Sequence, residues 1–277
     1  MGFTLQVLGT ASAVPNSVLN PSSQVLTVRG RLFMIDCGEG TQQMMRRMHL
    51  SFLKVEAIFI SHVHGDHVFG LPGVLSTMTL YGRSEPLHVF GPEALGGILD
   101  FYKSNFGERA SYEIVFHRVQ AESMEKVYLS HSGYLEVSAF PLNHRIECYG
   151  YRFDERISER SAMKRSAVSY AYCSDTAPFP QLPFYVSGVD VLYHEATYPA
   201  ELKDKAAQYF HSTTHDAAMT ALLASAGRLL IGHYSSRISD FEALRAECLA
   251  AFPNTTAVMD GDVIEIEGKR PEDENLG

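Results

Sequence analysis

Four side chains of the kinds that bind divalent cations fall within six residues. They are His62, His64, Asp66 and His67, in the stretch Ser-His-Val-His-Gly-Asp-His. A regular strand or helix cannot turn all four the same way, but a tight loop with Gly65 at its bend divides them into two sets. His62 and His64 would then face one cation. Asp66 and His67 would face a second. Imidazole and carboxylate ligands favour Zn²⁺, with Mn²⁺ or Fe²⁺ as alternatives.

A site for two cations needs further ligands, and three residues later in the chain can supply them. His144 follows Phe-Pro-Leu, Asp175 lies in Cys-Ser-Asp-Thr and His233 lies in Ile-Gly-His-Tyr. The two carboxylate oxygens of Asp175 can bridge a pair of cations, which then lie about 3.5–4 Å apart and hold a shared hydroxide. Bound cations lower the pKa of water toward about 7, so the site would supply a nucleophile at neutral pH.

The sequence predicts that buried strands position these residues. Four apolar runs of strand length end directly before, or within two residues of, a chemically active side chain: Val55–Ile60, Val168–Cys173, Val189–Tyr193 and Leu229–Gly232. A buried strand that stops in a polar cluster delivers that cluster to the sheet edge. We therefore expect the loop of residues 61–67, called the metal loop below, to meet Asp175, Glu195 and His233 at one edge of a sheet.

Other segments predict a mixed α/β chain. Helices are expected over Thr41–His49 (with Thr41 as N-cap), Leu71–Leu80, Glu93–Phe106, Asp216–Ala226 and Phe241–Ala251. The segment Arg152–Arg165 is charged and poor in large apolar residues, which suggests an inserted arm. If it is helical, its basic residues at i+4 spacing form one stripe able to meet phosphates: Arg152, Arg156, Arg160 and Lys164. The alternative is a solvated face of mixed charge.

Composition limits the class of protein. The chain has 277 residues, 45% of them hydrophobic, and a formal net charge of -9, so the surface is not basic throughout. The four cysteines have no C-x-x-C spacing, which predicts reduced, buried thiols. The N-terminus lacks the pattern of a signal peptide, and no stretch approaches the roughly 20 apolar residues of a membrane span. We expect a cytoplasmic protein with no membrane association.

The motifs together resemble a known family. The H-x-H-x-D-H loop followed by His, Asp and His is typical of the metallo-β-lactamase superfamily. Within it, the chain is most similar to the ribonuclease Z family, the endonucleases that trim the 3′ end of precursor transfer RNA. The matching stretches run in family order: VLGTASAVP, DCGEGTQQMMRRM, FISHVHGDHVFGLPG, PLNHRIECYGYRF, AYCSDT, LYHEATY, HSTTHDAA and IGHYSSR.

The resemblance implies a role for each site residue. It assigns one zinc to His62, His64 and His144, the other to Asp66, His67 and His233, and the bridging position to Asp175. It implies that Asp66 also helps to activate the attacking water, and that His211 and Glu195 act near the scissile phosphate. A histidine oriented by a carboxylate can protonate a ribose 3′-oxygen as it leaves. The alternatives are a structural ion pair for Glu195 and an N-capping or surface role for His211.

The resemblance also implies a fold and an assembly. The expected fold is an αββα sandwich of two mainly antiparallel sheets, with the metal site at the sheet edge. We expect one domain over residues 1–269, with a shortened arm-like insertion at 152–166, and a disordered tail at 270–277. Relatives are commonly homodimers, and we expect a homodimer here.

The chain differs from the family pattern in two segments that contact transfer RNA in many relatives. About thirty residues separate His144 from Asp175, too few for the full arm that grips transfer RNA in many relatives. The loop that reads P-x-K-x-R-N in many relatives keeps Pro15 and Asn20 but lacks both basic residues. In the family this loop helps to sense the mature CCA end, so the two missing basic residues leave open both this discrimination and the affinity for transfer RNA.

The leading hypothesis is a zinc-dependent endoribonuclease, with two Zn²⁺ per subunit, that removes 3′ trailers from precursor transfer RNA. Hydroxide held by the metals would attack the phosphodiester and leave a 3′-hydroxyl. The alternative is a phosphodiesterase of the same superfamily that acts on small or generic substrates. A non-catalytic binding protein would have gaps among the ligands, and every ligand position is filled.

Overall fold

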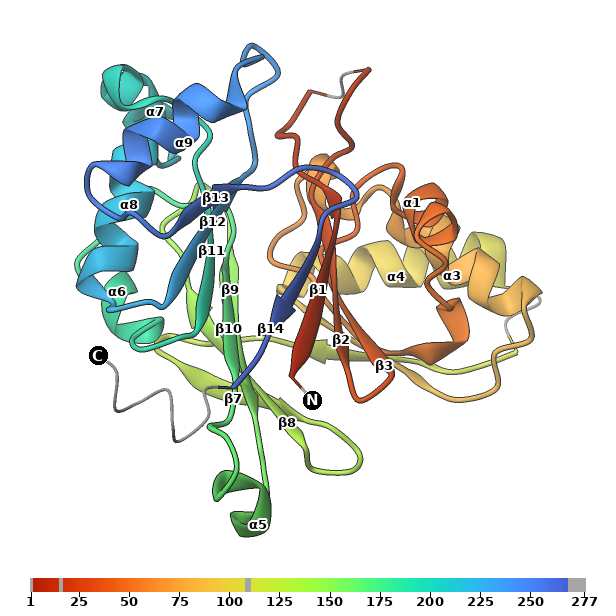
Figure 1. Cartoon of the computed structure of the whole chain (residues 1–277). Coiled ribbons are helices and arrows are strands. Elements are labelled where there is room, and N and C mark those ends of the chain that lie inside the picture. Colours follow the sequence, from red (N-terminus) through yellow and green to blue (C-terminus); the bar gives the residue numbers. More distant parts are fainter. Residues whose placement is uncertain (1, 15–16, 108–110, 269–277) are drawn as a thin grey trace.

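The computed structural model describes residues 2–14, 17–107 and 111–268, in which the strands form two sheets that face each other (Figure 1). In spatial order the first sheet contains β14 (Val263–Ile266), β1 (Phe3–Gly9), β2 (Ser23–Val28), β3 (Arg31–Ile35), β4 (Val55–Phe59), β5 (Leu87–Gly91) and β6 (Ile114–Arg118). The second contains β13 (Thr255–Ala257), β12 (Arg228–Gly232), β11 (Val191–Glu195), β10 (Ser169–Cys173), β9 (Tyr149–Glu155), β8 (Leu135–Pro141) and β7 (Glu125–Leu129).

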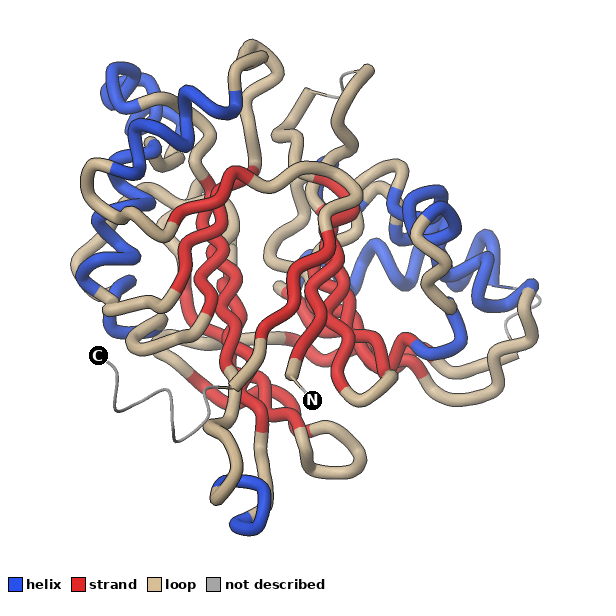
Figure 2. The backbone as a smooth tube through the Cα atoms, in the orientation of Figure 1, coloured by secondary structure: helices blue, strands red, loops and turns tan. Residues whose placement is uncertain are grey.

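Helices lie on the outer sides of the two sheets, as Figure 2 shows in blue. Those beside the first sheet are α1 (Thr41–Arg47), α2 (Gly65–Val68), α3 (Leu71–Leu80) and α4 (Glu93–Phe106), with the 3₁₀ turn η1 (Phe52–Lys54). Those beside the second are α6 (Leu182–Tyr185), α7 (Lys203–Tyr209), α8 (Thr214–Leu223) and α9 (Phe241–Leu249), with η3 (Ala200–Leu202). The short α5 (Glu159–Ala162) lies away from both layers.

Three apolar clusters hold these layers together. Large aromatic side chains, among them Phe59, Tyr151 and Phe153, fill the space between the sheets. A second cluster joins the first sheet to helices such as α3 through Leu75, and a third joins the second sheet to α8 through Ala218. Burying apolar surface on both faces of each sheet gives the αββα sandwich that the sequence predicted, and this fold is confirmed.

The prediction of mainly antiparallel sheets was wrong, because each sheet is mixed, with antiparallel pairs in one half and parallel pairs in the other. Strands β3 to β6 pair in parallel in the first sheet, and β10 to β13 pair in parallel in the second. Parallel neighbours need a crossover connection, and helices α3, α4, α8 and α9 supply several of these. Because parallel strands end at the same edge, β10, β11 and β12 carry Asp175, Glu195 and His233 to one place.

The arm expected over residues 152–166 is shorter than predicted. Residues Arg152 to Glu155 belong to β9, which pairs with β8 and β10. The only helix of this segment is α5, so the four basic residues do not form one helical stripe. Arg165 folds back and makes an ion pair of 2.7 Å with the buried Glu155. What protrudes is a short loop around α5.

Thr41 is not the N-cap of α1. Gly40, with a φ of 87°, occupies that position, and the Thr41 hydroxyl donates to the Gly38 carbonyl instead.

The four cysteines are free and buried, as predicted. Pro15 and the tail 270–277 lie outside the described residues. Within the described residues, no helix has the length and apolar character needed to cross a bilayer.

Candidate metal centre

The metal loop, residues 61–67, divides its ligand-type side chains as the sequence predicted. His64 has an extended backbone and is the N-cap of α2, which begins at Gly65. His62 and His64 therefore precede the helical turn, whereas Asp66 and His67 lie within it. The change from extended to helical backbone rotates the two pairs toward different neighbours.

The first group of converging side chains contains His62, His64, His144 and Asp175. His64 Nδ1 lies 3.0 Å from His62 Nε2 and 3.2 Å from His144 Nε2. Oδ2 of Asp175 lies 3.6 Å from His62 Nε2 and 3.8 Å from His144 Nε2. One ligand atom from each of the four lies within 4.8 Å of all the others.

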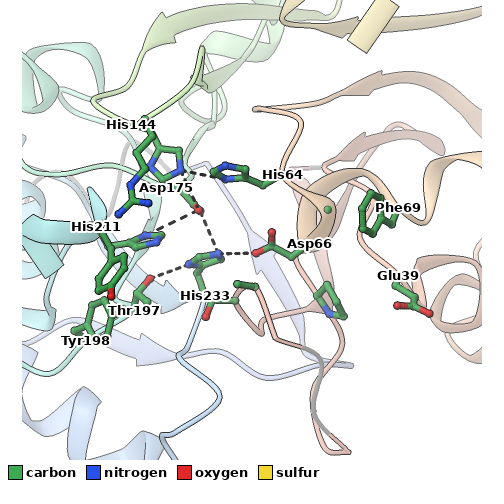
Figure 3. Close-up of a pocket in the computed structure, with 16 residues that line it drawn as sticks. Glu39, His64, Asp66, Phe69, His144, Asp175, Thr197, Tyr198, His211 and His233 are labelled. Carbon is green, nitrogen blue, oxygen red and sulfur yellow. Dashed lines mark hydrogen bonds and ion pairs between the residues drawn. The ribbon is translucent and has the colours of Figure 1, made fainter. Parts of the chain in front are cut away.

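The second group contains Asp66, His67 and His233. His233 Nε2 lies 3.3 Å from both His67 Nε2 and Asp66 Oδ2. Oδ1 of Asp175 lies 3.3 Å from His67 Nε2 and 3.1 Å from His233 Nε2. Asp175 thus directs one oxygen toward each group, which is the geometry that a bridging carboxylate requires. Figure 3 shows Asp175 between His144 and His233.

The protonation of the three imidazoles in the first group suits cation binding. Burial, reinforced by the neighbouring His67, holds the pKa of His62 well below its ordinary value. Burial also lowers the pKa of His64 and of His144, although Asp175 opposes it. These rings are neutral at pH 7, and a neutral imidazole nitrogen has the lone pair that a metal ion needs.

The carboxylates of the centre are ionised. Burial raises the pKa of Asp175, but His233 and His67 outweigh it and hold the pKa well below the ordinary range. Asp66 behaves in the same way, mainly through His67. In return, Asp175 and Asp66 overcome burial and raise the pKa of His67 well above its ordinary value. Two buried carboxylates and converging imidazole nitrogens make a donor set that fits divalent cations.

Asp36, which the sequence reasoning did not single out, orients this donor set. It lies just after β3, is fully buried, and its Oδ2 lies 2.7 Å from His67 Nδ1. The same carboxylate accepts from the Ser61 backbone N–H at 2.7 Å and from the Tyr172 hydroxyl at 2.7 Å. With Nδ1 donating to Asp36, Nε2 of His67 faces the centre, where a bound cation would take the place of the proton that the raised pKa keeps on this ring in the metal-free protein. The sequence could have indicated Asp36, because this residue directly follows the apolar end of a strand.

Two further contacts orient other imidazoles. The Thr197 hydroxyl donates to Glu195 and lies 2.8 Å from His233 Nδ1, so it accepts the proton of that nitrogen. His144 Nδ1 donates to the Phe210 carbonyl at 3.1 Å. In both rings Nε2 is left to face the centre.

His211, which is partly exposed to the cavity, pairs with the buried Glu195 beside the centre. His211 Nδ1 lies 2.9 Å from Glu195 Oε1, which also accepts from the Thr176 backbone N–H at 2.7 Å. Burial lowers the pKa of His211, but the Glu195 carboxylate prevails and raises it to about 9. His211 Nδ1 lies 4.0 Å from Asp175 Oδ2, farther than the imidazole nitrogens of His67 and His233.

A cavity of about 570 Å³ opens over the two groups. Figure 3 shows His64, Asp66, His144, Asp175, His211 and His233 pointing toward one another, with Phe69 and Glu39 on the opposite wall from Tyr198. The cavity draws its lining from loops of both sheets. Its size is that of a site for a nucleotide-sized ligand rather than for a single ion.

Three residues at this site have an unusual backbone. Asp36, Phe210 and His233 have φ values of 54°, 59° and 60°, although none is glycine. Such conformations cost of order 1 kcal/mol or more and tend to occur at functional sites. At His233 and Asp36 the left-handed turn comes where the chain leaves a strand, and at Phe210 it ends α7 so that His211 turns toward the cavity.

The chain is similar to proteins whose function is known. It is 38% identical to the ribonuclease Z of Porphyromonas gingivalis, over 92% of this chain and 96% of the relative, and 37% identical to that of Parabacteroides distasonis, over 94% and 97%. The chain belongs to the ribonuclease Z family. Ribonuclease Z enzymes are metal-dependent hydrolases, so this chain is one too, as the motifs predicted.

Solved structures agree with this membership of the ribonuclease Z family. The short form of human tRNase Z matches with a TM-score of 0.81 and 27% identity, over 95% of this chain and 99% of the human chain. The metallo-β-lactamase fold protein YhfI of Bacillus subtilis matches with a TM-score of 0.77, but at 19% identity it speaks for the fold alone. Residues 3–100 also match the family model described as anti-Pycsar protein Apyc1.

Proposed function

We propose that this protein is an endoribonuclease that removes 3′ trailers from precursor transfer RNA and leaves a 3′-hydroxyl. The proposal rests on the seven converging ligand-type side chains with the His211–Glu195 pair directly beside them. The ribonuclease Z relatives, 34–38% identical over nearly the full chain, support the choice of substrate.

We propose that the centre holds two Zn²⁺ per subunit, with Mn²⁺ or Fe²⁺ as alternatives. One ion would be held by the first group, the other by Asp66, His67 and His233, and Asp175 would bridge them. When bound, the ions lower the pKa of water and neutralise charge on the phosphodiester.

Asp66 would orient the attacking water, and His211 would supply the proton that the leaving group needs. The Asp66 carboxylate lines the cavity, and its low pKa leaves it ionised, so it can orient the attacking water by accepting a hydrogen bond. His211 keeps its proton at neutral pH because of Glu195, and its Nε2 forms no hydrogen bond within the described residues. Protonated Nε2 can therefore give a proton to the ribose 3′-oxygen as the P–O bond breaks.

Mapping of product ends is the direct test of this function. A 3′-extended transfer RNA, with and without CCA, is incubated with the holoenzyme in zinc and in manganese. A single cut near the 3′ side of the acceptor stem, leaving a 3′-hydroxyl, is the expected result. Uncut RNA or scattered cuts would refute the proposal.

Two variants separate the proposed roles. Asp66→Ala removes a ligand as well as the group that orients water, and is expected to abolish cleavage. His211→Ala is expected to lower turnover by roughly 10²–10⁴-fold, the usual contribution of acid–base catalysis, with metal content unchanged. Loss of a metal ion from His211→Ala would make His211 a ligand instead.

A second candidate function is that of a phosphodiesterase for small substrates. The short loop around α5 and the absence of basic residues in the loop 15–20 favour it, because both features reduce the means of holding a large RNA. Turnover of a chromogenic phosphodiester, with extended transfer RNA left intact, would establish this candidate over the first.

We also propose a homodimer, since relatives commonly act as dimers in which one subunit's arm holds RNA for the other. Light scattering at catalytic concentrations is expected to give twice the 30.8 kDa mass of the chain. A monomeric mass would remove the dimer from the account and leave the metal centre unaffected.

A further inference from the structure

One wall of the cavity carries aromatic rings and an arginine that the catalytic proposal does not use. We call Arg145, Tyr198 and Tyr209 the Arg145 platform; all three line the cavity. The Arg145 guanidinium lies over the Tyr209 ring, 5.1 Å from its centroid, and 6.0 Å from that of Phe210. Arg145 Nη2 also donates to the Gln208 carbonyl at 3.0 Å, so this hydrogen bond helps to hold the guanidinium in position.

Arg145 is the only arginine or lysine among the described residues that line the cavity. Near Arg145, the polar groups that line the cavity are otherwise the carboxylates and imidazoles of the metal centre. Gln208 is its only hydrogen-bond partner in the described part of the chain, which leaves most of its five N–H donors for a ligand. A fixed guanidinium beside a ring is a surface on which a nucleobase can stack.

Stability alone does not account for this arrangement. Arg145 is exposed, Tyr209 is 40% exposed and Phe210 is 37% exposed, so the contact buries little apolar surface. Exposed cation–π pairs contribute little to folding. The platform is instead placed next to the reaction, because Arg145 directly follows His144 and Tyr209 ends the helix that precedes His211.

The position of His211 decides which nucleotide would reach the platform. The Tyr198 ring lies 6.2 Å from the His211 ring, and His144 lies 5.4 Å from it. His211 is proposed to protonate the leaving 3′-oxygen, and that oxygen belongs to the ribose of the nucleotide on the 5′ side of the cut. Figure 3 shows Tyr198 beside His211, so a base attached to this ribose would be within reach of Tyr198 and the platform.

We propose that the Arg145 platform binds the nucleobase immediately upstream of the scissile phosphate, by stacking on the Arg145 guanidinium and the tyrosine rings. This inference rests on the proposed RNA substrate and on the role of His211. Stacking orients the ribose so that its 3′-oxygen faces His211. Because every base has a stacking face, the platform strengthens binding at this position with little preference among the four bases.

The test uses holoenzyme, single-turnover kinetics and two modified substrates. One 3′-extended transfer RNA has an abasic nucleotide immediately upstream of the cut, and the other has it immediately downstream. For the wild-type enzyme, removal of the upstream base is expected to lower kcat/KM by about 10-fold, the size of one stacking contact. Arg145→Ala and Tyr209→Ala are expected to cleave normal RNA about 10-fold more slowly and to lose sensitivity to the upstream base alone.

Conservative variants distinguish stacking from attraction to a phosphate. Tyr209→Phe retains the ring and is expected to keep the sensitivity to the upstream base that Tyr209→Ala loses. Arg145→Lys retains the charge but not the planar group, and is expected to behave as Arg145→Ala. Rescue by lysine would replace stacking with a phosphate contact and overturn the proposal.

A matched control lies elsewhere in the chain. The Arg29 guanidinium is 5.1 Å from the Tyr134 ring centroid and 41% exposed, but it does not line the cavity. Arg29→Ala is expected to keep full sensitivity to the upstream base. Metal content is measured for every variant, and a platform variant that has lost metal and kept its base sensitivity contradicts the inference.

The proposed function and the platform can be refuted separately. If the wild-type enzyme does not cleave transfer RNA, the proposed function is wrong and the platform inference falls with it. If the wild type cleaves RNA but Arg145→Ala and Tyr209→Ala remain fully sensitive to the upstream base, only the platform inference is wrong.

Discussion

At the scale of single residues, the Asp36 carboxylate accepts hydrogen bonds from Ser61 N, Ser61 Oγ, His67 Nδ1 and Tyr172 Oη. Groups that hold a ligand in its tautomer and orientation contribute strongly to metal affinity. The amide of Asp36→Asn has one accepting oxygen in place of two and adds a donor. We expect this variant to bind metal about 10- to 100-fold more weakly, as measured by competition with a chelator.

Tyr172→Phe is the matched control for that experiment, because it removes one donor and leaves the carboxylate in place. Its loss of affinity is expected to be smaller than that of Asp36→Asn. Equal affinity of Asp36→Asn and wild type would show that His67 needs no orienting group.

The His211–Glu195 pair predicts how the stability of the metal-free protein depends on pH. Burial lowers the pKa of His211, but Glu195 raises it from the ordinary 6.5 to about 9. A pKa that is higher in the folded state stabilises the fold below the unfolded pKa, and this stabilisation is lost as the pH rises through the folded pKa. The pair is therefore fully effective below about pH 6.5, and its contribution of about 3 kcal/mol disappears as the pH rises to about 9 and beyond.

Chemical denaturation of chelator-treated protein between pH 6 and 10 measures this effect. Wild type is expected to lose more stability over that range than His211→Gln, which has no group to titrate at that position. Parallel curves for the two proteins would mean that Glu195 does not raise the pKa of His211.

Sequence reasoning reached the seven ligand-type residues because each follows or lies near the apolar end of a strand. It missed Asp36 and Thr197 because they contact imidazoles rather than a cation, and those contacts depend on the tautomer of each ring. It also missed the Phe210 carbonyl, because every residue has a backbone carbonyl and the residue type does not show which one accepts a hydrogen bond. These three contacts depend on turns with positive φ or on side-chain orientation, which residue types alone do not determine.

At the scale of elements, the metal loop is held against the loop that follows β3. Cys37 N donates to the His67 carbonyl at 2.8 Å, and Gly70 N donates to the Cys37 carbonyl at 2.9 Å. A Cβ added at Gly70 would lie 2.1 Å from the Gly38 carbonyl oxygen. The two loops therefore approach more closely than any residue with a side chain would permit.

Gly70→Ala is expected to destabilise the protein by about 1–3 kcal/mol, because backbone must move to admit the methyl group. Gly97→Ala, in the exposed interior of α4, is the control, since a Cβ there has nothing within 4 Å. It is expected to stabilise the protein by about 0.5–1 kcal/mol through its higher helix propensity. Denaturation midpoints that move in the same direction for both variants would contradict this account.

Strand β9 explains why the arm was overestimated from the sequence. Its residues alternate, with Tyr151 and Phe153 in the core between the sheets and Arg152 and Asp154 on the other face. The charges of the outer face suggested a solvated insertion, whereas the alternation indicates a half-buried strand. Glu155 is buried at the end of β9 because Arg165 pairs with it, a long-range contact that charge alone could not reveal.

At the scale of the whole molecule, one aromatic core lies between the two sheets and contacts both. We propose that residues 1–269 form a single domain, as the motif order suggested. Unfolding of the metal-free protein is then expected to occur in one transition, with coincident curves from far-UV circular dichroism and tyrosine fluorescence. Two separated transitions would indicate that the sheets belong to independent units.

The mixed α/β class was predictable because apolar runs alternate with helical segments, and the resemblance to a known family supplied the αββα arrangement. The pairing direction was not, because antiparallel and parallel strands have similar composition when both faces are buried. The site depends on that direction, since the parallel order of β10, β11 and β12 is what brings Asp175, Glu195 and His233 to one edge.

We propose that seven side chains from both halves of the sandwich hold a pair of cations. Anomalous diffraction at the zinc edge, from crystals of protein loaded with zinc, tests it most directly. We predict two peaks about 3.5–4 Å apart, with one Asp175 oxygen on each and three further ligands at each peak. A single peak, or peaks away from Asp175, would contradict the account.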